Sequence, residues 1–212
     1  MTPFETESYH SQLQGWPTSG KHIMAHYDDE SIVVYQAYNP AIADFAVTNQ
    51  RFGGPFSFSR MSWIKSNFLW MMYRCGWATK ENQERVLAVR ISRTGFDQLL
   101  HQAVHSAFLV SAYPDKDTWQ DLVGRGDVRL QWDPDHDPYG APQQRRAIQL
   151  GLRRSMLAAY ATDWIIAISD ITGFVHDQRT HVQKRNLDKL QLPLEREYSM
   201  PPSEARNRLF AN

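Results

Sequence analysis

The sequence predicts an α+β fold, organised as a single domain with mixed or antiparallel sheets and flanking helices. Three observations support this prediction. The chain has 212 residues, of which 42% are apolar, so it can bury one substantial core but is short for two full domains. Strand-like and helix-like segments are mixed without a strict βαβ rhythm. The sequence also has no internal repeat and no glycine-rich phosphate loop, which disfavours a doubly wound nucleotide fold.

The chain is expected to divide into three regions. Residues 1–20 contain several Pro, Gly and Ser residues and lack a sustained hydrophobic period, which predicts a loose N-terminal arm. Residues 21–190 carry the periodic segments and form the expected domain. Residues 191–212 contain three prolines and are expected to pack as an irregular C-terminal strap.

The elements of the domain follow from hydrophobic periodicity. Runs rich in β-branched and aromatic residues predict strands, and apolar residues three or four apart after a capping residue or a proline predict helices. Strands are expected at 22–27, 31–38, 85–91, 127–132, 147–152 and 164–168. Helices are expected at 40–50, 94–106, 153–162 and 171–187. The polar stretches 111–126 and 133–144 are expected to be loops.

The segment 58–77 is unusually rich in aromatic residues, because it contains three of the seven Trp, three of the seven Met and three cations. Trp63, Trp70 and Trp77 are seven residues apart, and seven positions return to nearly the same face of a helix, so any helical part is strongly one-sided. The start of that helix stays open. Three serines can each cap it, namely Ser59, Ser62 and Ser66. A late start would leave Trp63 outside the helix.

Two interpretations of this segment remain. It can be a core helix, since buried aromatic side chains dominate core energetics. It can also be the wall of a binding site, because an apolar floor with Arg60, Lys65 and Arg74 at its rim could hold a planar, anionic molecule such as a nucleotide.

Charge and cysteine content exclude several classes. The 23 cations balance the 23 anions, which argues against a general polyanion binder. Residues 60–93 and 145–212 are nevertheless net positive, so a local phosphate-binding surface stays possible. Cys75 is the single cysteine, which excludes an internal disulfide and favours a cytoplasmic location. No signal segment or membrane span is recognisable, so neither export nor membrane insertion is expected.

Two patterns contain metal-ligating residue types. Asp133-Pro134-Asp135-His136-Asp137 lacks the glycine and the distal Glu of a calcium loop and suits an exposed turn. His101 and His105 are four residues apart on an expected helix, but no third ligand is evident, so surface histidines are the default interpretation. We therefore predict no metal site.

Two glutamines interrupt otherwise apolar strand patterns and are candidate site residues. Gln36 alternates with Tyr35 and Ala37, and Gln149 follows Arg146 in a second such strand. A glutamine side chain offers both a hydrogen-bond donor and an acceptor, so each could present a polar group inside a cleft. In the alternative interpretation both face water. The string Gln131-Trp132-Asp133 adds a third polar cluster beside an aromatic ring.

Specific strings carry a family resemblance, namely Tyr27-Asp28, residues 32–39, residues 60–65, residues 68–74, residues 131–134 and residues 146–149. By these strings the chain from about Lys21 to Val182 is identified as a member of the domain-of-unknown-function 4291 family. More distantly, Val34-Tyr35-Gln36-Ala37 is similar to the first-strand motif of the ADP-ribosyltransferase superfamily, in which a Tyr-(Arg or His)-(Gly or Ala) strand grips NAD.

The second resemblance implies a split α+β sandwich around an NAD cleft and a reaction that moves ADP-ribose to an acceptor with loss of nicotinamide. Breaking that bond builds positive charge on the ribose, so a polar or anionic side chain nearby favours the transition state. Gln149 and Gln36 are the catalytic candidates. The superfamily usually has Glu in the place of Gln149 and Arg or His in the place of Gln36, so a protein that binds without transfer stays open.

The same resemblance implies which residues hold NAD. Arginine forks suit phosphate oxygens, and aromatic rings would stack on nicotinamide or adenine. The NAD-binding candidates are Tyr35, Tyr38, Arg60, Trp63, Lys65, Trp70, Arg74 and Arg146. The acceptor could be a nucleic acid, a protein or a small molecule, and the oligomeric state stays open. Two other functions compete, a nucleic-acid-binding module that uses residues 60–80 and a protein-interaction domain without catalysis.

Overall fold

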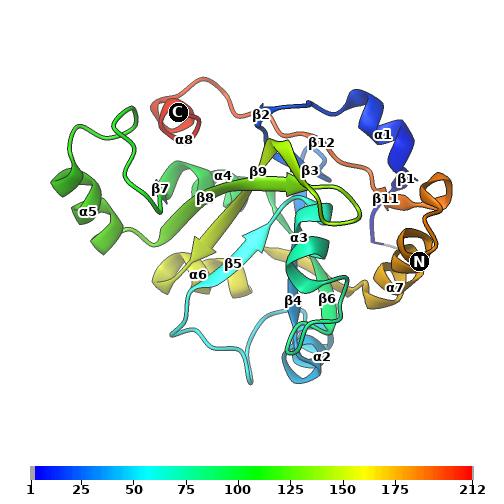
Figure 1. Ribbon diagram of the computed structural model, residues 1–212. Helices are drawn as coiled ribbons and strands as arrows, with labels where there is room; N and C mark the ends of the chain where they lie inside the picture. Colours follow the sequence, from blue (N-terminus) through cyan, green and yellow to red (C-terminus); the bar gives the residue numbers. More distant parts are fainter. Residues whose placement is uncertain (1–2, 212) are drawn as a thin grey trace.

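A sheet of eight strands is the central feature of the computed structural model, which describes residues 3–211 of the chain (Figure 1). Seven strands follow one another in the order β10 (Ile165–Asp170), β6 (Arg85–Ser92), β4 (Ser31–Tyr38), β5 (Ser62–Lys65), β9 (Pro142–Leu152), β8 (Val128–His136) and β7 (Ala103–His105). The eighth strand, β2 (Gly20–Lys21), runs parallel to β9, and β7 runs parallel to β8. The other neighbours are antiparallel. The expected α+β domain with mixed sheets and flanking helices is confirmed.

The sheet is divided between β4 and β5. β4 pairs with β6 along its whole length, from Ser31 to Tyr38, whereas in the described chain β4 and β5 share a single ladder pair, Tyr35 with Lys65. Figure 1 shows β4 and β6 crossing the view steeply while β5, β8 and β9 run obliquely. The sheet therefore consists of two diverging halves, β10-β6-β4 and β5-β9-β8-β7.

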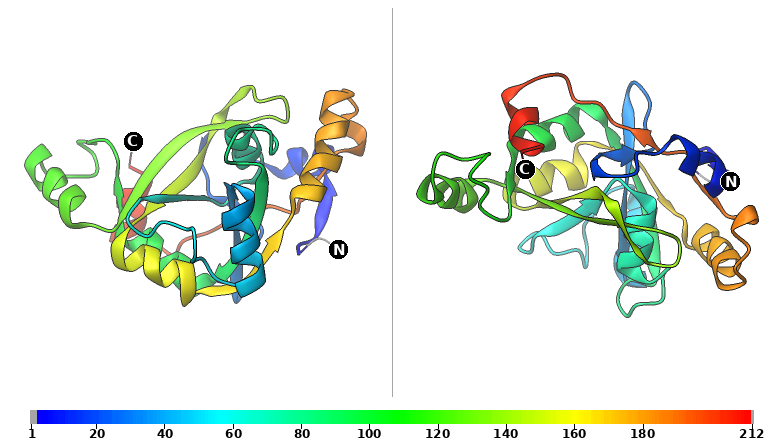
Figure 2. Two further views of the ribbon diagram at one scale, coloured as in Figure 1. Left: turned by 90° about the horizontal axis from the view of Figure 1, so that it is seen from below. Right: turned by 45° about the horizontal axis from the view of Figure 1, so that its top comes forward.

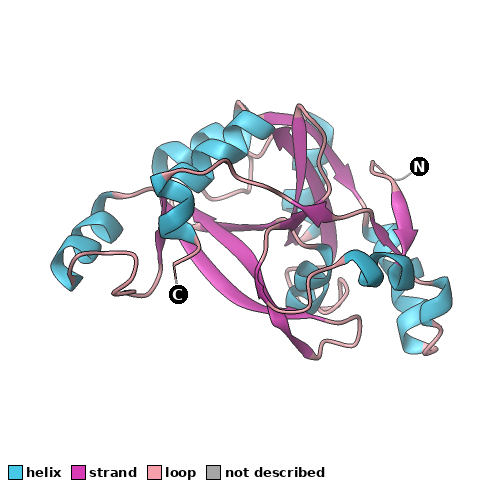
Figure 3. Cartoon of the chain, turned by 90° about the horizontal axis from the view of Figure 1, so that it is seen from above, coloured by secondary structure: helices cyan, strands magenta, loops and turns pink. Residues whose placement is uncertain are grey.

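Each face of the sheet carries its own core, because successive side chains of a strand point to opposite faces. Ile32 and Val34 of β4 belong to the first core, and Val33 and Tyr35 belong to the second. The first core is covered by α2 (Pro40–Asn49), α4 (Arg93–Gln102) and α6 (Arg154–Thr162). The second is covered by α1 (Tyr9–Gly15), α3 (Phe68–Cys75) and α7 (Thr172–Gln183). Figure 3 shows helices flanking the strands on both sides.

Several elements lie where periodicity placed them. The strands expected at 31–38 and 85–91 are β4 and β6, and the helix expected at 40–50 is α2, whose first turn is capped by the Asn39 side chain. The helix expected at 153–162 and the strand expected at 164–168 are α6 and β10. These predictions are confirmed, because the buried apolar residues of each element pack into one or both of the two cores.

The aromatic segment begins its helix late. The Asn67 side chain accepts a hydrogen bond from the Trp70 amide at 2.7 Å and so caps α3, which starts at Phe68. None of the three serines expected as caps is used. Trp63 lies instead in β5, whose residues pair with Gln149, Leu150, Gly151 and Leu152 of β9. The ladder hydrogen bonds with β9 outweigh the local helical pattern at this position.

Three other expectations are wrong. The stretch 111–126 contains the helix α5 (Lys116–Arg125), capped by Asp115. The stretch 133–144 is not all loop, because β8 continues to His136 and β9 begins at Pro142. The buried Asp135 and Arg145 form an ion pair between the two strands. The helix expected at 94–106 ends at Gln102, and the chain continues as β7, where pairing with β8 replaces helical bonds.

The ends of the chain also differ from expectation. Within the expected loose arm, β1 (Thr6–Ser8) precedes α1, and Phe4, Tyr9 and Trp16 are buried. Within the expected strap, β11 (Gln191–Pro193) pairs with β1, β12 (Arg196–Glu197) pairs with β3 (Met24–Ala25), and α8 (Glu204–Leu209) packs on α4. Along the upper edge of Figure 1 lie α8, β2, β12, β3 and α1, and the right-hand view of Figure 2 turns this edge forward. Residues 1, 2 and 212 lie outside the described residues.

Candidate functional site

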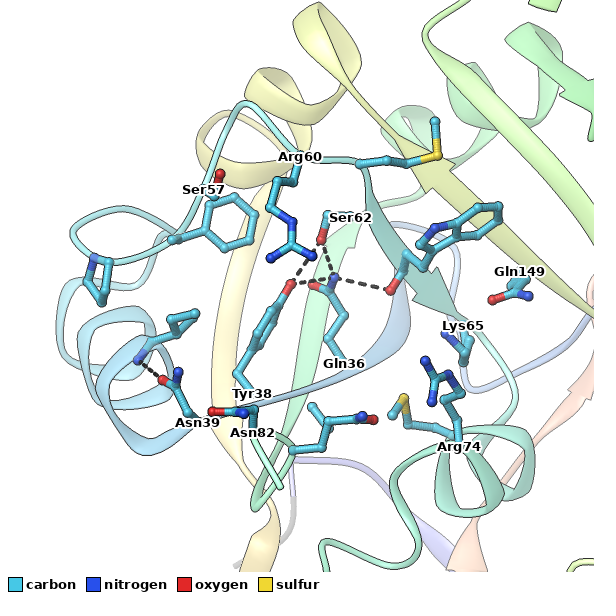
Figure 4. Close-up of a pocket in the computed structure, with 18 of the residues that line it drawn as sticks. Gln36, Tyr38, Asn39, Ser57, Arg60, Ser62, Lys65, Arg74, Asn82 and Gln149 are labelled. Carbon is cyan, nitrogen blue, oxygen red and sulfur yellow. Dashed lines mark hydrogen bonds between the residues drawn. The ribbon is translucent and has the colours of Figure 1, made fainter. Parts of the chain in front are cut away.

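A cavity of about 870 Å³ opens where β4 and β5 separate. This volume is within the range of small-molecule and cofactor sites. Ten candidate site residues follow from the sequence, and seven of them line this cavity (Figure 4). These are Gln36, Tyr38, Arg60, Trp63, Lys65, Arg74 and Gln149. They come from β4, β5, β9, α3 and the loop before β5, so the cavity brings together segments that are far apart in the sequence.

Three nominated residues lie elsewhere. Tyr35 is fully buried in the second core, where its ring packs edge-on against Phe68. Trp70 is buried on α3 with its ring 5.7 Å from that of Tyr73. Arg146 is exposed on β9, and the alternation of the strand directs it to the face opposite Gln149. These three residues do not line the cavity.

One row of residues crosses the divided sheet at the cavity. Gln131, Gln149, Lys65 and Tyr35 are successive partners on β8, β9, β5 and β4. Because paired residues share a face, the side chains of Gln131, Gln149 and Lys65 stand side by side. This pairing places Lys65, from the aromatic segment, next to Gln149, which lies more than eighty residues later in the chain.

Gln36 is the centre of a hydrogen-bond network in the cavity wall. Its amide nitrogen donates to the Tyr38 hydroxyl at 2.8 Å, the Ser62 hydroxyl at 2.9 Å and the Trp63 carbonyl at 3.2 Å. Its amide oxygen accepts from the Tyr160 hydroxyl at 2.6 Å. Since these bonds use the hydrogen-bonding groups of the amide, Gln36 positions Tyr38 and Ser62 rather than offering a free group to a ligand.

Gln149 differs from Gln36, because in the described part of the chain only the nitrogen of its amide is hydrogen-bonded to other side chains. Its amide nitrogen donates to the Gln131 side-chain oxygen and to the Asp133 carboxylate, both at 2.7 Å. Both partners are acceptors there, which fixes the nitrogen on their side. The amide oxygen of Gln149 is therefore left on the cavity side, as Figure 4 shows.

Lys65 is the most buried cation in the cavity wall, at 4% exposure. Its ammonium lies 5.5 Å from the centre of the Trp70 ring. Burial and the neighbouring Arg74 guanidinium lower the pKa of Lys65 to about 8, against the opposing effect of the Asp133 carboxylate. Lys65 forms no ion pair with any residue in the range 3–211.

Arg60 and Arg74 complete a positively charged cavity. Figure 4 shows Arg74 beside Lys65 and Arg60 on the other side, near Tyr38 and Ser62. Neither arginine forms a salt bridge within the described part of the chain. Three cations without an anionic partner around one hollow favour an anionic ligand, because such a ligand would offset their mutual repulsion.

Sequence reasoning missed the role of Asp133. It considered this residue as part of a possible metal-binding string and of the polar cluster Gln131-Trp132-Asp133, but not as a partner of Gln149, to whose amide the structure bonds its carboxylate. Strand alternation from Gln131 would have predicted this side of β8 for Asp133. Ser62 was missed as well, because it was weighed only as a helix cap.

The two candidate metal patterns have other roles. His105 lies on β7 and is buried, not on the surface as expected, with its ring bonded to the Tyr113 hydroxyl and the Leu209 carbonyl. Burial lowers the pKa of His105 to about 4. Among residues 3–211 no group of three His, Cys, Asp or Glu side chains could hold a metal ion. No helix in that range combines the length and apolarity needed to cross a bilayer.

The comparisons with known proteins place most of the chain in one family. No curated protein matches the chain. The family model described as "Domain of unknown function (DUF4291)" matches residues 22–198, which include both halves of the sheet and every residue that lines the cavity. The protein therefore belongs to the DUF4291 family.

Proposed function

We propose that the cavity binds NAD or a related nucleotide and that the protein is an ADP-ribosyltransferase-like enzyme. The observation that carries this proposal is the trio of cations without an anionic partner, Arg60, Lys65 and Arg74, around one cavity of about 870 Å³. A ligand with two phosphates and flat rings would satisfy both the charge and the aromatic lining of this cavity.

The phosphates would lie between Lys65 and Arg74. Arg74 lowers the pKa of Lys65, so these two cations are near enough to repel each other, and a bound pyrophosphate would remove that repulsion. The indole of Trp63 covers Gly151, because a Cβ atom there would lie 2.9 Å from the ring. This close contact fixes Trp63 as a flat wall on which a base or a nicotinamide could stack.

Transfer of ADP-ribose would use Gln149 and Asp133. The bond between ribose and nicotinamide breaks with positive charge building on the sugar, and a group of negative potential stabilises that charge. The amide oxygen of Gln149 is on the cavity side, and the carboxylate of Asp133 lies 2.7 Å from its nitrogen. Asp133 would thus supply, through Gln149, part of the negative potential that a neutral amide lacks.

Isothermal titration calorimetry with NAD tests the binding step. Arg74→Ala should weaken NAD binding by about 10- to 100-fold, which corresponds to the loss of charge-assisted hydrogen bonds. Lys116→Ala, which removes a cation on α5 away from the cavity, is the matched control and should bind like the wild type. Equal affinities in the two variants would reject the placement of the phosphates.

The same titrations with short single-stranded nucleic acid at two salt concentrations test the competing function. Polynucleotide binding should weaken by orders of magnitude between 50 and 200 mM salt, whereas NAD binding should weaken far less. The transfer step is tested by nicotinamide release from NAD. Gln149→Ala should slow release by about 100-fold with little change in affinity, and binding without any release in the wild type would reject transfer.

A further inference from the structure

Lys65 is buried and its ammonium has no bonded partner among the described residues, which is unusual for a lysine that only contacts phosphate. Its side chain is 4% exposed yet lines the cavity, and the described residues give its ammonium neither a salt bridge nor a hydrogen bond. Its surroundings are the Trp70 ring and Arg74 from α3, with the carboxylate of Asp133 acting from β8. A buried lysine beside a second cation is a typical setting for an amine nucleophile.

We propose that Lys65 is a nucleophilic amine that forms an imine with the aldehyde group of an anionic ligand in the cavity. The ligand class is a phosphate-bearing aldehyde, such as the open-chain form of a sugar phosphate. Arg60, which lies across the cavity from Lys65, would hold the phosphate, so that Lys65 is free to meet the carbonyl carbon. This assignment goes beyond the nucleotide-binding function and does not require it.

The reaction balances without any further reagent. The lone pair of the neutral Lys65 Nζ attacks the carbonyl carbon, and the carbonyl oxygen leaves as water with the two hydrogens of the amine. A carbon–nitrogen double bond replaces the carbon–oxygen double bond, and no oxidant or reductant is consumed. The imine can then be protonated, with the resulting charge near the Asp133 carboxylate.

The protonation state of Lys65 supports this chemistry. Burial and Arg74 lower its pKa to about 8, while Asp133 and Cys75 act in the opposite direction. Near neutral pH a larger fraction of Lys65 therefore carries a neutral amine than of an unperturbed lysine. Lys80 provides the contrast within the same region, because it is exposed and its ammonium donates to the Arg74 carbonyl at 2.7 Å.

Pyridoxal 5′-phosphate with borohydride reduction is the test, because this probe carries an aldehyde, a phosphate and a flat ring. Peptide mass spectrometry of the labelled wild-type protein should show Lys65 modified at least about tenfold faster than Lys80. Labelling of Lys65 should reach half of its maximal rate near pH 8 and should slow when inorganic pyrophosphate is added. Labelling of Lys80 as fast as of Lys65 in the wild type would overturn the proposal without the need for any variant.

Lys65→Arg tests whether the amine of Lys65 is the group that reacts. The variant keeps the positive charge but cannot form an imine, so fast labelling should disappear. Lys80→Arg is the matched control and should keep fast labelling at Lys65. Fast labelling that persists in Lys65→Arg would reject the proposal, whereas imine trapping at Lys65 in a wild-type protein that binds no NAD in calorimetry would support it independently of the nucleotide-binding function.

Discussion

At the scale of single residues, the two candidate glutamines differ in which of their amide atoms already have hydrogen-bond partners. Both lie in strands and both line the cavity. The amide of Gln36 is satisfied by Tyr38, Ser62, Trp63 and Tyr160, so its function is to position other groups. Gln149 has its nitrogen bonded and its oxygen on the cavity side. The same residue type thus has a structural role in one strand and a candidate chemical role in another.

Gln149→Glu should test the contact with Asp133. The substitution removes two donated hydrogen bonds and brings two carboxylates together, so we expect a loss of about 2–4 kcal/mol in unfolding free energy at pH 7.5. Repulsion raises the folded-state pKa of the pair above its unfolded value. The folded state then binds more protons, and the loss should shrink as the pH falls to 5.

Urea denaturation at pH 5 and pH 7.5 measures this effect relative to the wild type. Gln149→Ala is the control, because it removes the hydrogen bonds without adding charge, and its loss should be nearly the same at both pH values. A loss that does not depend on pH in Gln149→Glu would show that the two side chains are not in contact in solution.

His105 should make the stability of the protein depend on pH. Its pKa is about 4 in the folded state, against 6.5 for an unperturbed histidine. Between these values the unfolded state binds a proton that the folded state does not, so stability should fall as the pH decreases from about 6.5 to 4. His105→Gln should flatten this part of the curve. His101→Gln, on the surface of α4, should leave it unchanged, and equal slopes in the two variants would contradict the assignment.

At the scale of elements, the separation of β4 from β5 creates the site. A fully paired sheet would have closed the gap, because neighbouring strands lie about 4.8 Å apart. With a single ladder pair between them, at Tyr35 and Lys65, the two backbones separate beyond this point. Side chains such as Gln36 and Ser62 bond across the gap and line the hollow that it leaves. Side chains from both faces of the sheet can therefore reach one cavity.

Gly151→Ala should disturb one wall of this hollow. The new methyl group would lie 2.7 Å from the Met61 sulfur and 2.9 Å from the Trp63 ring, so both side chains must move. We expect a loss of about 1–3 kcal/mol in unfolding free energy, together with weaker NAD binding in calorimetry.

Gly124→Ala is the control for this prediction. Gly124 lies within α5 with no atom within 4 Å of the added methyl group, so alanine should raise stability by up to about 1 kcal/mol and leave NAD affinity unchanged. If Gly151→Ala binds NAD as tightly as Gly124→Ala, the Trp63 wall does not contact the ligand.

At the scale of the whole molecule, the two ends of the chain complete the domain. β1 pairs with β11, and the side chain of Gln12 donates to the Pro193 carbonyl at 3.0 Å. Trp16 donates from its indole to the Glu195 carbonyl at 3.1 Å, and the Arg145 guanidinium lies 4.9 Å from its ring centre. The N-terminal segment therefore joins the C-terminal strap to the β8–β9 hairpin.

Trp16→Ala should destabilise the whole fold. The side chain is 7% exposed, and removal of a buried indole costs about 3–5 kcal/mol. Leu13→Ala on the same helix is the control, because Leu13 is 46% exposed and should change the unfolding free energy by less than about 0.5 kcal/mol. Equal, small losses in urea denaturation would mean that the segment does not pack on the domain in solution.

The sequence by itself determined the α+β class, the buried strands β4 and β6, the helices α2 and α6, and seven of the residues that meet at the cavity. These are local properties, since periodicity and residue chemistry act within one segment. Only the tertiary structure decided the start of α3, the packing of the chain ends, and that Tyr35, Trp70 and Arg146 lie outside the cavity lining. It also brought Asp133 to Gln149. The physical reason is that strand pairing fixes register and face between segments far apart in the chain, and no local pattern encodes that pairing.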